Sequence, residues 1–182
     1  DLSMVPTRQA FAAAALLAMA GMLWAAPDKT GSVKLTGMHN CCGSCDKSIK
    51  KAATVGGATV QTDREAGTAV ITGDSDAVLA GIKALLEAGF YAKVDNAKVA
   101  MPDQSKSYKG KSVSRLEVKD THLCCGRCIK GVGEALKDVK GVEANSAKKG
   151  AKSWAIEGNF DAGEAIAALN KAGFAVTVVS VK

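Results

Sequence analysis

Aromatic residues are scarce in this chain: Trp, Tyr and Phe together make up 4% of its 182 residues. Sites that bind nucleic acids usually combine basic residues with aromatic side chains that stack on the bases. The formal net charge is +6, but the Lys residues are scattered between short apolar runs. We therefore expect no nucleic-acid partner and interpret the charge as solvated surface, which is also compatible with docking onto an acidic protein or an anionic membrane.

Histidine is even rarer, and both copies lie in one repeated motif. The first copy reads HNCCGSC over residues 39–45, and the second reads HLCCGRC over residues 122–128. All six cysteines of the chain also lie in these two copies. A repeat of this kind predicts two small domains, residues 30–96 and 112–182, joined by the polar segment 97–111.

Residues 1–26 have the features of a secretory signal peptide. Arg8 supplies positive charge, and residues 10–24 form an apolar core that is short for a membrane span. Cleavage is expected near Ala25; a retained N-terminal anchor is the alternative. The sequence thus predicts an exported protein, periplasmic or secreted, with no stable membrane insertion after cleavage. Thiols in such compartments tend to form disulfides unless a metal ion or a dedicated reductant holds them.

Hydrophobic periodicity predicts the same order of elements in both halves. In the first half we expect strands at 32–36, 58–62, 68–72 and 90–94, with helices starting near Cys45 and near Asp74 or Ser75. In the second half we expect strands around 116–118 and at 142–145, 153–157 and 175–181, with helices after the second motif and from Asp161. The order predicts an α+β fold of two ferredoxin-like βαββαβ domains, each a four-stranded antiparallel sheet with both helices on one face.

The spacing of the cysteines indicates a metal site in each motif. Cys42 and Cys45 are placed on a loop and in the first turn of the following helix, so their sulfurs can converge on one ion. The positive end of the helix dipole stabilises the thiolate, which is the form that binds metal. Basic residues near the motifs add positive charge: Lys47, Lys50, Arg127 and Lys130. Thiolates favour soft ions such as Cu(I), Zn(II), Cd(II) and Hg(II), so we expect about one such ion per domain, at an accessible edge of the fold.

A CxxC pair between the first strand and the first helix of a βαββαβ unit resembles the heavy-metal-associated domain family. That family includes copper chaperones, the N-terminal modules of metal-transporting ATPases and the periplasmic mercury-binding protein. The resemblance covers residues 32–94 and 113–181. It implies one metal-binding pair in each half, namely Cys42 with Cys45 and Cys125 with Cys128. It also implies transfer to a metal-transporting or metal-accepting protein.

The chain departs from the family pattern, which has Gly-Met and one further residue before CxxC. In the first half Gly37-Met38 is present, but residues 39–41 intervene before Cys42; in the second half Asp120-Thr121 replaces Gly-Met. The family pattern therefore gives no role to four further candidates: Cys41, Cys124, His39 and His122. Phe90 and Phe174, each after a glycine, resemble the aromatic position that approaches the metal loop in bacterial members.

These four additional residues recur at matching positions in both motifs. We expect the histidines to bind metal or to support the ligands; the alternative is a loop residue that only orients the turn. We expect the additional cysteines to be third ligands or resolving thiols, and the alternative is a small buried hydrophobic residue.

The protein is expected to be a metal-binding protein and not an enzyme. It would sequester metal or transfer it by thiolate ligand exchange, and the sequence does not choose between storage and delivery. The rival function is a thiol-disulfide oxidoreductase, because a low-pKa CxxC at a helix start also suits redox catalysis. A third alternative is that the cysteines form only disulfide staples, although a disulfide within one short loop constrains little chain entropy.

Overall fold

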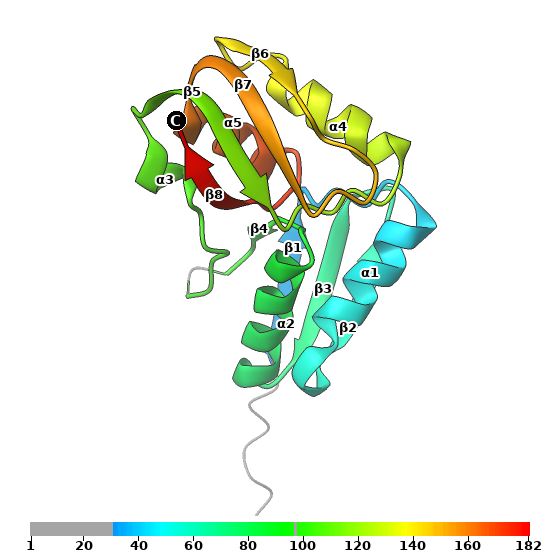
Figure 1. Cartoon of the computed structure of the whole chain (residues 1–182). Helices are drawn as coiled ribbons and strands as arrows, with labels where there is room; N and C mark the ends of the chain where they lie inside the picture. Colours follow the sequence, from blue (N-terminus) through cyan, green and yellow to red (C-terminus); the bar gives the residue numbers. More distant parts are fainter. Residues whose placement is uncertain (1–30, 97) are drawn as a thin grey trace, which may run out of the picture.

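The structure is a computed structural model that describes residues 31–96 and 98–182 (Figure 1). The predicted signal peptide lies outside the described residues. Within these two ranges, none of the helices has both the length and the apolar character required to cross a membrane.

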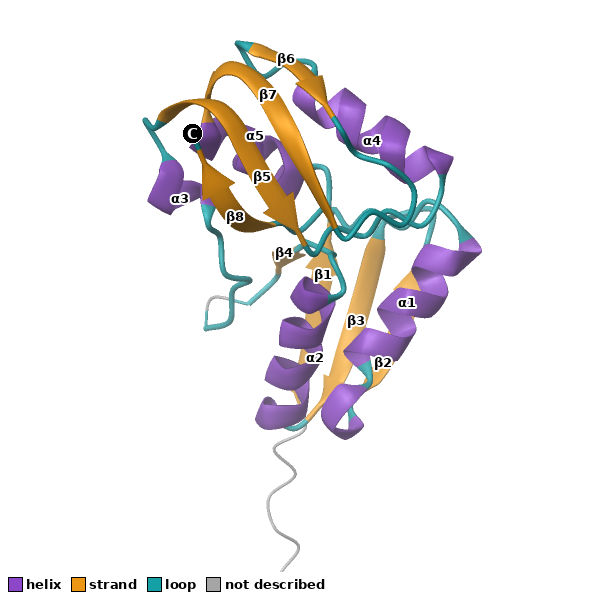
Figure 2. Ribbon diagram, viewed as in Figure 1, coloured by secondary structure: helices purple, strands orange, loops and turns teal. Residues whose placement is uncertain are grey.

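The first half forms one sheet covered by two long helices (Figure 2). Its strands pair antiparallel in the order β2-β3-β1-β4. The elements are β1 (Gly31–Thr36), α1 (Gly43–Ala53), the 3-10 helix η1 (Val55–Gly57), β2 (Thr59–Asp63), β3 (Thr68–Gly73), α2 (Ser75–Glu87) and β4 (Lys93–Val94).

The second half repeats this arrangement with the strand order β6-β7-β5-β8, again antiparallel. Its elements are α3 (Ser105–Tyr108), β5 (Ser112–Lys119), α4 (Gly126–Leu136), β6 (Val142–Asn145), β7 (Ser153–Asp161), α5 (Ala162–Lys171) and β8 (Thr177–Val181). Both sheets have the first strand of the repeat in the centre, flanked by the third and fourth. This confirms the predicted fold class of two ferredoxin-like α+β domains.

The second helix of each domain begins where the sequence predicts. The side chain of Asp74 accepts a hydrogen bond of 2.7 Å from the amide of Ala77 and thereby caps α2. Asp161 caps α5 in the same way, through a 2.8 Å bond from the amide of Glu164. By contrast, α1 begins at Gly43, two residues before the expected Cys45, so Cys42 itself occupies the N-cap position.

The last strand of the first domain is shorter than predicted. The sequence suggested a strand over residues 90–94, whereas β4 contains only Lys93 and Val94. Phe90 instead forms an isolated antiparallel bridge with Phe174 of the second domain. The amide of Tyr91 donates to the carbonyl of Gly173 at 3.0 Å, so the backbone here pairs between domains and not within its own sheet.

The segment predicted as a linker also contributes to packing. It contains the short helix α3, and Met101 and Ser105 within it are buried. The carboxylate of Asp103 accepts a 2.9 Å hydrogen bond from the side chain of Asn170 on α5. The connection therefore lies against the second domain and leads directly into β5.

Two glycines allow the domains to approach each other closely. Gly89 follows α2 and Gly173 follows α5, and both have a positive φ, 86° and 85°. A Cβ atom on Gly89 would lie 2.2 Å from the amide nitrogen of His122, and one on Gly173 would lie 2.2 Å from that of His39. Only glycine fits both the backbone conformation and the space. This contact brings each helix end against the cysteine loop of the other domain.

Candidate metal centre

The two cysteine motifs face each other across the domain interface and form one cluster. Each supplies an N-cap cysteine, the cysteine before it, and a third in the first turn of α1 or α4. Ten of the distances between their Sγ atoms fall between 3.5 and 3.9 Å. We call this set the six-cysteine cage: Cys41, Cys42, Cys45, Cys124, Cys125 and Cys128. All six are free thiols.

The cage has a buried side and a partly exposed side. Cys45 and Cys128 are 0% exposed, and their sulfurs lie 3.9 Å apart. The other four cysteines are partly buried. The sequence predicted ligands at an accessible edge of each domain. In the folded chain that edge is covered by the other domain, which places the ligands at an interface.

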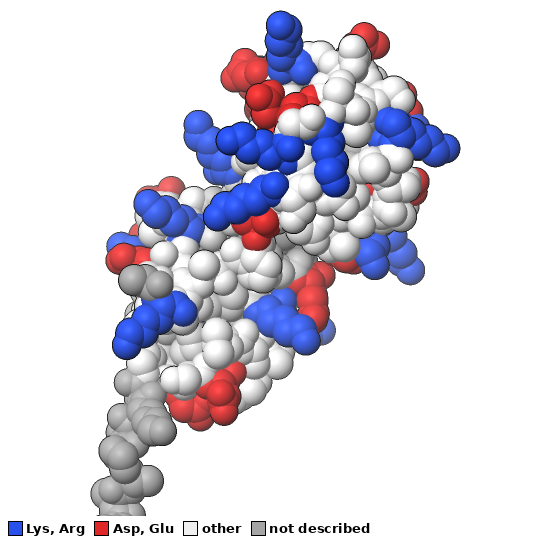
Figure 3. Space-filling view, turned by 90° about the vertical axis from the view of Figure 1, so that its left-hand side faces the viewer, with Lys and Arg blue, Asp and Glu red and all other residues white. Residues whose placement is uncertain are grey.

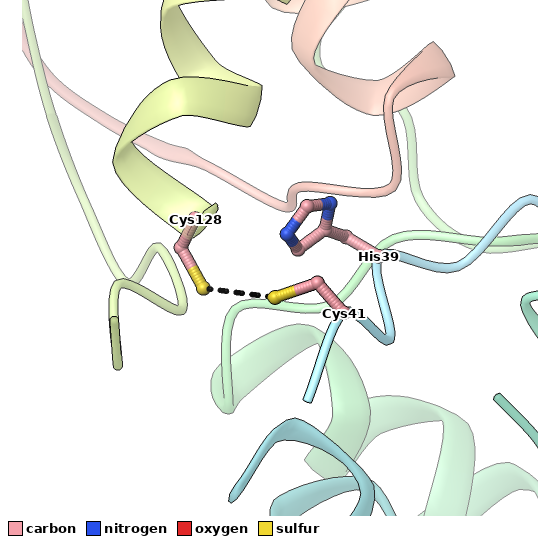
Figure 4. Close-up of side chains that lie close together, drawn as sticks. All are labelled: His39, Cys41 and Cys128. Carbon is pink, nitrogen blue, oxygen red and sulfur yellow. Dashed lines mark hydrogen bonds between the residues drawn. The ribbon is translucent and has the colours of Figure 1, made fainter. Parts of the chain in front are cut away.

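The two histidines lie beside the cage at equivalent positions. A ring nitrogen of His39 and the sulfurs of Cys41 and Cys128 all lie within 4.8 Å of one another (Figure 4). His122 forms the matching group with Cys45 and Cys124. Each histidine thus approaches one sulfur from each domain. The Nε2 atoms of both histidines are buried and have no hydrogen-bond partner among the described residues, which leaves a lone pair or a proton unsatisfied.

Each histidine stacks on a phenylalanine of the opposite domain. The ring of His39 lies 4.2 Å from that of Phe174, and the ring of His122 lies 4.3 Å from that of Phe90, measured between centroids. The sequence suggested that both phenylalanines approach the metal loop. They do so, but each contacts the motif of the other domain, a crossing that the resemblance did not indicate.

Helix α4 also packs closely against His39, at Gly131. A Cβ atom on Gly131 would lie 2.9 Å from Cε1 of His39 and 3.1 Å from Cζ of Phe174. The absence of a side chain at this position lets the imidazole lie between the helix and the phenyl ring. Sequence reasoning did not single out this residue, and a glycine inside a predicted helix was the available signal.

The loop of the first motif is held by polar contacts. Asp46 accepts hydrogen bonds from the side chains of Asn40, at 3.2 Å, and Thr62, at 2.6 Å. Its other oxygen pairs with Lys50 at 2.7 Å. These partners lower the pKa of Asp46 to about 2, with Lys50 as the largest cause. Lys50 therefore neutralises a carboxylate that orders the loop, and its charge is not free for the sulfurs.

The second motif is held by apolar packing and one cross-domain bond. Leu123, which corresponds to Asn40, is buried. Arg127 donates from Nη1 to the carbonyl oxygen of Cys41 at 2.6 Å, so it joins the two cysteine loops directly. Lys47 and Lys130 are exposed. Of the four basic residues noted in the sequence, Arg127 is the one that contacts the other motif.

The two residues that replace Gly-Met in the second domain keep the same backbone path. Asp120 has a φ of 57°, in the left-handed region, where Gly37 of the first domain has 73°. Asp adopts this conformation at a modest cost. Thr121 is buried and accepts a 3.1 Å hydrogen bond from the indole of Trp154. The departure from the family pattern therefore leaves the loop geometry intact.

Burial and the helix N-termini shift the pKa values of the thiols in different directions. The backbone amide of Cys45 lowers the pKa of Cys42 to about 6, despite some burial. Burial raises the pKa values of Cys41 and Cys124 to about 12. At neutral pH the metal-free cage thus contains a mixture of thiolate and thiol.

The thiols of the central pair, Cys45 and Cys128, influence each other's pKa values. The hydrogen bond between Cys45 and Cys128 raises the pKa of the first and lowers that of the second. Because the two residues occupy equivalent positions, these opposite directions describe one thiolate and one thiol and not a difference between the domains. Burial lowers the pKa of His122, although the charge of Cys128 opposes this. A neutral imidazole is the form that can bind metal.

The donor set fits soft metal ions. Four groups of three donors have all atoms within 4.8 Å of one another: His39, Cys41 and Cys128; Cys41, Cys42 and Cys45; Cys42, Cys124 and Cys125; Cys45, His122 and Cys124. Three of these groups combine residues of both domains. All eight predicted site residues are therefore brought together, although which of them bind an ion stays a prediction. Sequence reasoning missed that the two motifs form a single centre.

Charged residues are mixed on the face of the protein shown in Figure 3. Lys and Arg side chains are spread over both domains there, with Asp and Glu side chains between them.

Comparison with known proteins gives few similarities. No family model and no curated protein matches the chain. Among solved structures, the chain resembles the N-terminal soluble domains of Bacillus subtilis CopA, determined in solution. The sequence identity is 14% and the TM-score 0.32, over 84% of this chain and 95% of that chain. Similarity this low supports no functional conclusion, so the fold assignment depends on the strand order and the metal centre on its own geometry.

Proposed function

We propose that the chain is an exported protein that binds soft metal ions, with Cu(I) favoured over Hg(II), Zn(II) and Cd(II). We further propose that it belongs with the heavy-metal-associated domains. The observation that carries this proposal is the six-cysteine cage, in which thiols from two domains lie 3.5 to 3.9 Å apart without being bonded. Disulfide sulfurs lie about 2.05 Å apart, whereas thiolates on one ion are separated by nearly twice that distance.

The function is to sequester the ion and to release it by ligand exchange, with no bond chemistry catalysed on a substrate. Burial of Cys45 and Cys128 supports retention of the ion. Cys42 is partly exposed and has the pKa lowered to about 6, so its thiolate is available to an arriving ion or to the thiol of a partner protein. The signal-peptide features of residues 1–26 support export, and N-terminal sequencing of the mature protein together with cell fractionation tests it.

A thiol-disulfide oxidoreductase is the second candidate, favoured by the lowered pKa of Cys42 and its distance of 3.5 Å from Cys45. Against it, the thiols of Cys41, Cys45 and Cys124 have raised pKa values, and Cys45 is fully buried. We expect the reduced mature protein to have no activity in an insulin reduction assay. Turnover in that assay, abolished by Cys42→Ser, would favour this candidate.

Competition titrations test metal binding. The reduced mature protein is titrated anaerobically with Cu(I) against a chelator, and in parallel with Zn(II), Cd(II) and Hg(II). We expect Cu(I) to bind at least about 100-fold more tightly than to a control chain with all six cysteines changed to Ser. Equal affinities for the two chains would refute the proposal.

A further inference from the structure

The six sulfurs are too far apart for a single ion to bond to all of them at once. Ten sulfur pairs at 3.5 to 3.9 Å, together with Cys41–Cys42 and Cys124–Cys125 within 4.8 Å, correspond to the twelve edges of a distorted octahedron. An ion at the centre of such a cage would lie about 2.6 Å from every sulfur, whereas metal–thiolate bonds are about 2.3 Å long. One ion could therefore reach some of the sulfurs and would leave the others as buried thiols.

The triangular faces of the cage have a more suitable size. Cys45, Cys124 and Cys128 lie 3.5, 3.7 and 3.9 Å from one another. The centre of such a triangle lies about 2.0 to 2.2 Å from its corners, which approaches the length of a metal–thiolate bond after a small expansion. A face of this kind offers three sulfurs in a plane to one soft ion.

Four such faces use every sulfur twice. Two have all edges between 3.5 and 3.9 Å, namely Cys45-Cys124-Cys128 and Cys41-Cys125-Cys128. The other two, Cys41-Cys42-Cys45 and Cys42-Cys124-Cys125, have all their sulfurs within 4.8 Å. Each of the six cysteines belongs to two of these four triangles, and three of the triangles combine both domains.

We propose that the six-cysteine cage holds a polynuclear Cu(I)–thiolate cluster of about four ions, one on each of these faces, with every thiolate bridging two ions. This inference rests on the proposed soft-metal function and extends it. As the ions bind, each thiol releases its proton to solvent and each sulfur forms bonds to two ions. No oxidant or reductant is consumed, because copper enters and remains as Cu(I).

The surroundings of the cage suit such a cluster. Singly charged ions on thiolates that outnumber them leave a net negative charge. The N-termini of α1 and α4 and the guanidinium of Arg127 lie beside it and offset that charge. Zinc prefers four donors at the corners of a tetrahedron. In an octahedral cage no four sulfurs are all neighbours of one another, so the sulfurs alone offer no tetrahedral site. Three-sulfur faces therefore favour Cu(I).

Native mass spectrometry of the intact, reduced mature chain during anaerobic Cu(I) titration tests the proposal. We expect the metal-free chain to convert to a species with about four ions, with few intermediates, and X-ray absorption to show metal–metal scattering. Cys41→Ser removes a sulfur shared by two faces and should reduce the maximum to about two ions. Ser44→Ala changes an exposed residue of the same motif, in the first turn of α1, and should retain about four.

The outcomes separate this inference from the proposed function. A plateau at one or two ions per chain, without metal–metal scattering, overturns the cluster and leaves soft-metal binding in place. Absence of Cu(I) binding overturns both. Iron with acid-labile sulfide in the purified protein also overturns the cluster, as does a Cys41→Ser variant that still takes up four ions.

Discussion

The sulfurs of Cys45 and Cys128 lie 3.9 Å apart, although Cys45 lies on α1 of the first domain and Cys128 on α4 of the second. Both side chains are fully buried. The sulfur of Cys45 lies 3.5 Å from that of Cys124 and 3.9 Å from that of Cys128, so residues of the other domain form part of the surface that covers it. The metal centre is therefore a property of the domain interface.

Substitution of this central pair should affect the whole centre. We expect Cys45→Ser and Cys128→Ser each to weaken Cu(I) binding by more than the about 10 to 100-fold typical for loss of a supporting group. Both variants should bind fewer Cu(I) ions, and the loss should involve cysteines of both domains. Titration against a chelator measures this. A variant whose remaining ions bind with unchanged affinity would show instead that the domains bind independently.

The close approach at Gly89 gives a second prediction. Gly89→Ala places a Cβ atom 2.2 Å from the amide nitrogen of His122, so we expect it to lower the free energy of unfolding and to weaken metal binding. Gly110→Ala is the matched control: its φ of 79° is similarly unfavourable, but nothing lies within 4 Å. The control should cost about 1 to 2 kcal/mol in urea unfolding, and Gly89→Ala more. Equal effects of the two substitutions would argue against the tight interface.

Two glycines on α4 separate helix propensity from contact with the metal centre. Gly131→Ala would bring its Cβ atom to 2.9 Å from His39 and should displace the imidazole, lowering metal affinity. Gly133→Ala has open space around its Cβ atom and should stabilise the protein by about 0.5 to 1 kcal/mol with unchanged metal affinity. Thermal unfolding and chelator competition on both variants test this pair. The prediction fails if Gly131→Ala binds metal as the unmodified chain does.

The role of the histidines can be separated from their packing. We expect His39→Ala to weaken Cu(I) binding by about 10 to 100-fold, because it removes the buried Nε2 beside Cys41 and Cys128. Phe174→Leu disturbs the stacking on His39 but retains the imidazole, so it should lower stability with a smaller effect on affinity. If both variants lose affinity equally, His39 serves to pack the loop and not to support the ligands.

Asp46 predicts a pH dependence of stability in the metal-free, reduced protein. Its folded pKa of about 2 lies below the ordinary 3.8. A lowered folded pKa stabilises the protein above the ordinary value, and this contribution is lost as the pH falls from about 4 to about 2. Asp46→Asn should therefore reduce the free energy of unfolding by about 1 to 2 kcal/mol at pH 7, with a difference that shrinks towards pH 2. Urea unfolding at several pH values measures it, and a pH-independent difference would contradict the assignment.

The sequence by itself determined the fold class and the chemistry of the ligands. The period of the apolar residues and the caps at Asp74 and Asp161 predicted the helices, because these signals are local. The repeated motif predicted which side chains could bind a soft ion, because thiol and imidazole chemistry depends on residue type. Neither conclusion required knowledge of how the two domains are placed.

The tertiary structure decided that the two motifs form one centre. The periodicity marks Phe90 and Phe174 as buried but does not say against which surface. The contacts that dock the domains include backbone hydrogen bonds next to Gly89 and Gly173, and such bonds leave no pattern of side chains in the sequence. Two separate sites and one shared cage are therefore equally compatible with the sequence. Only the packing of one domain on the other, through glycines that permit a close backbone approach, places all six sulfurs together.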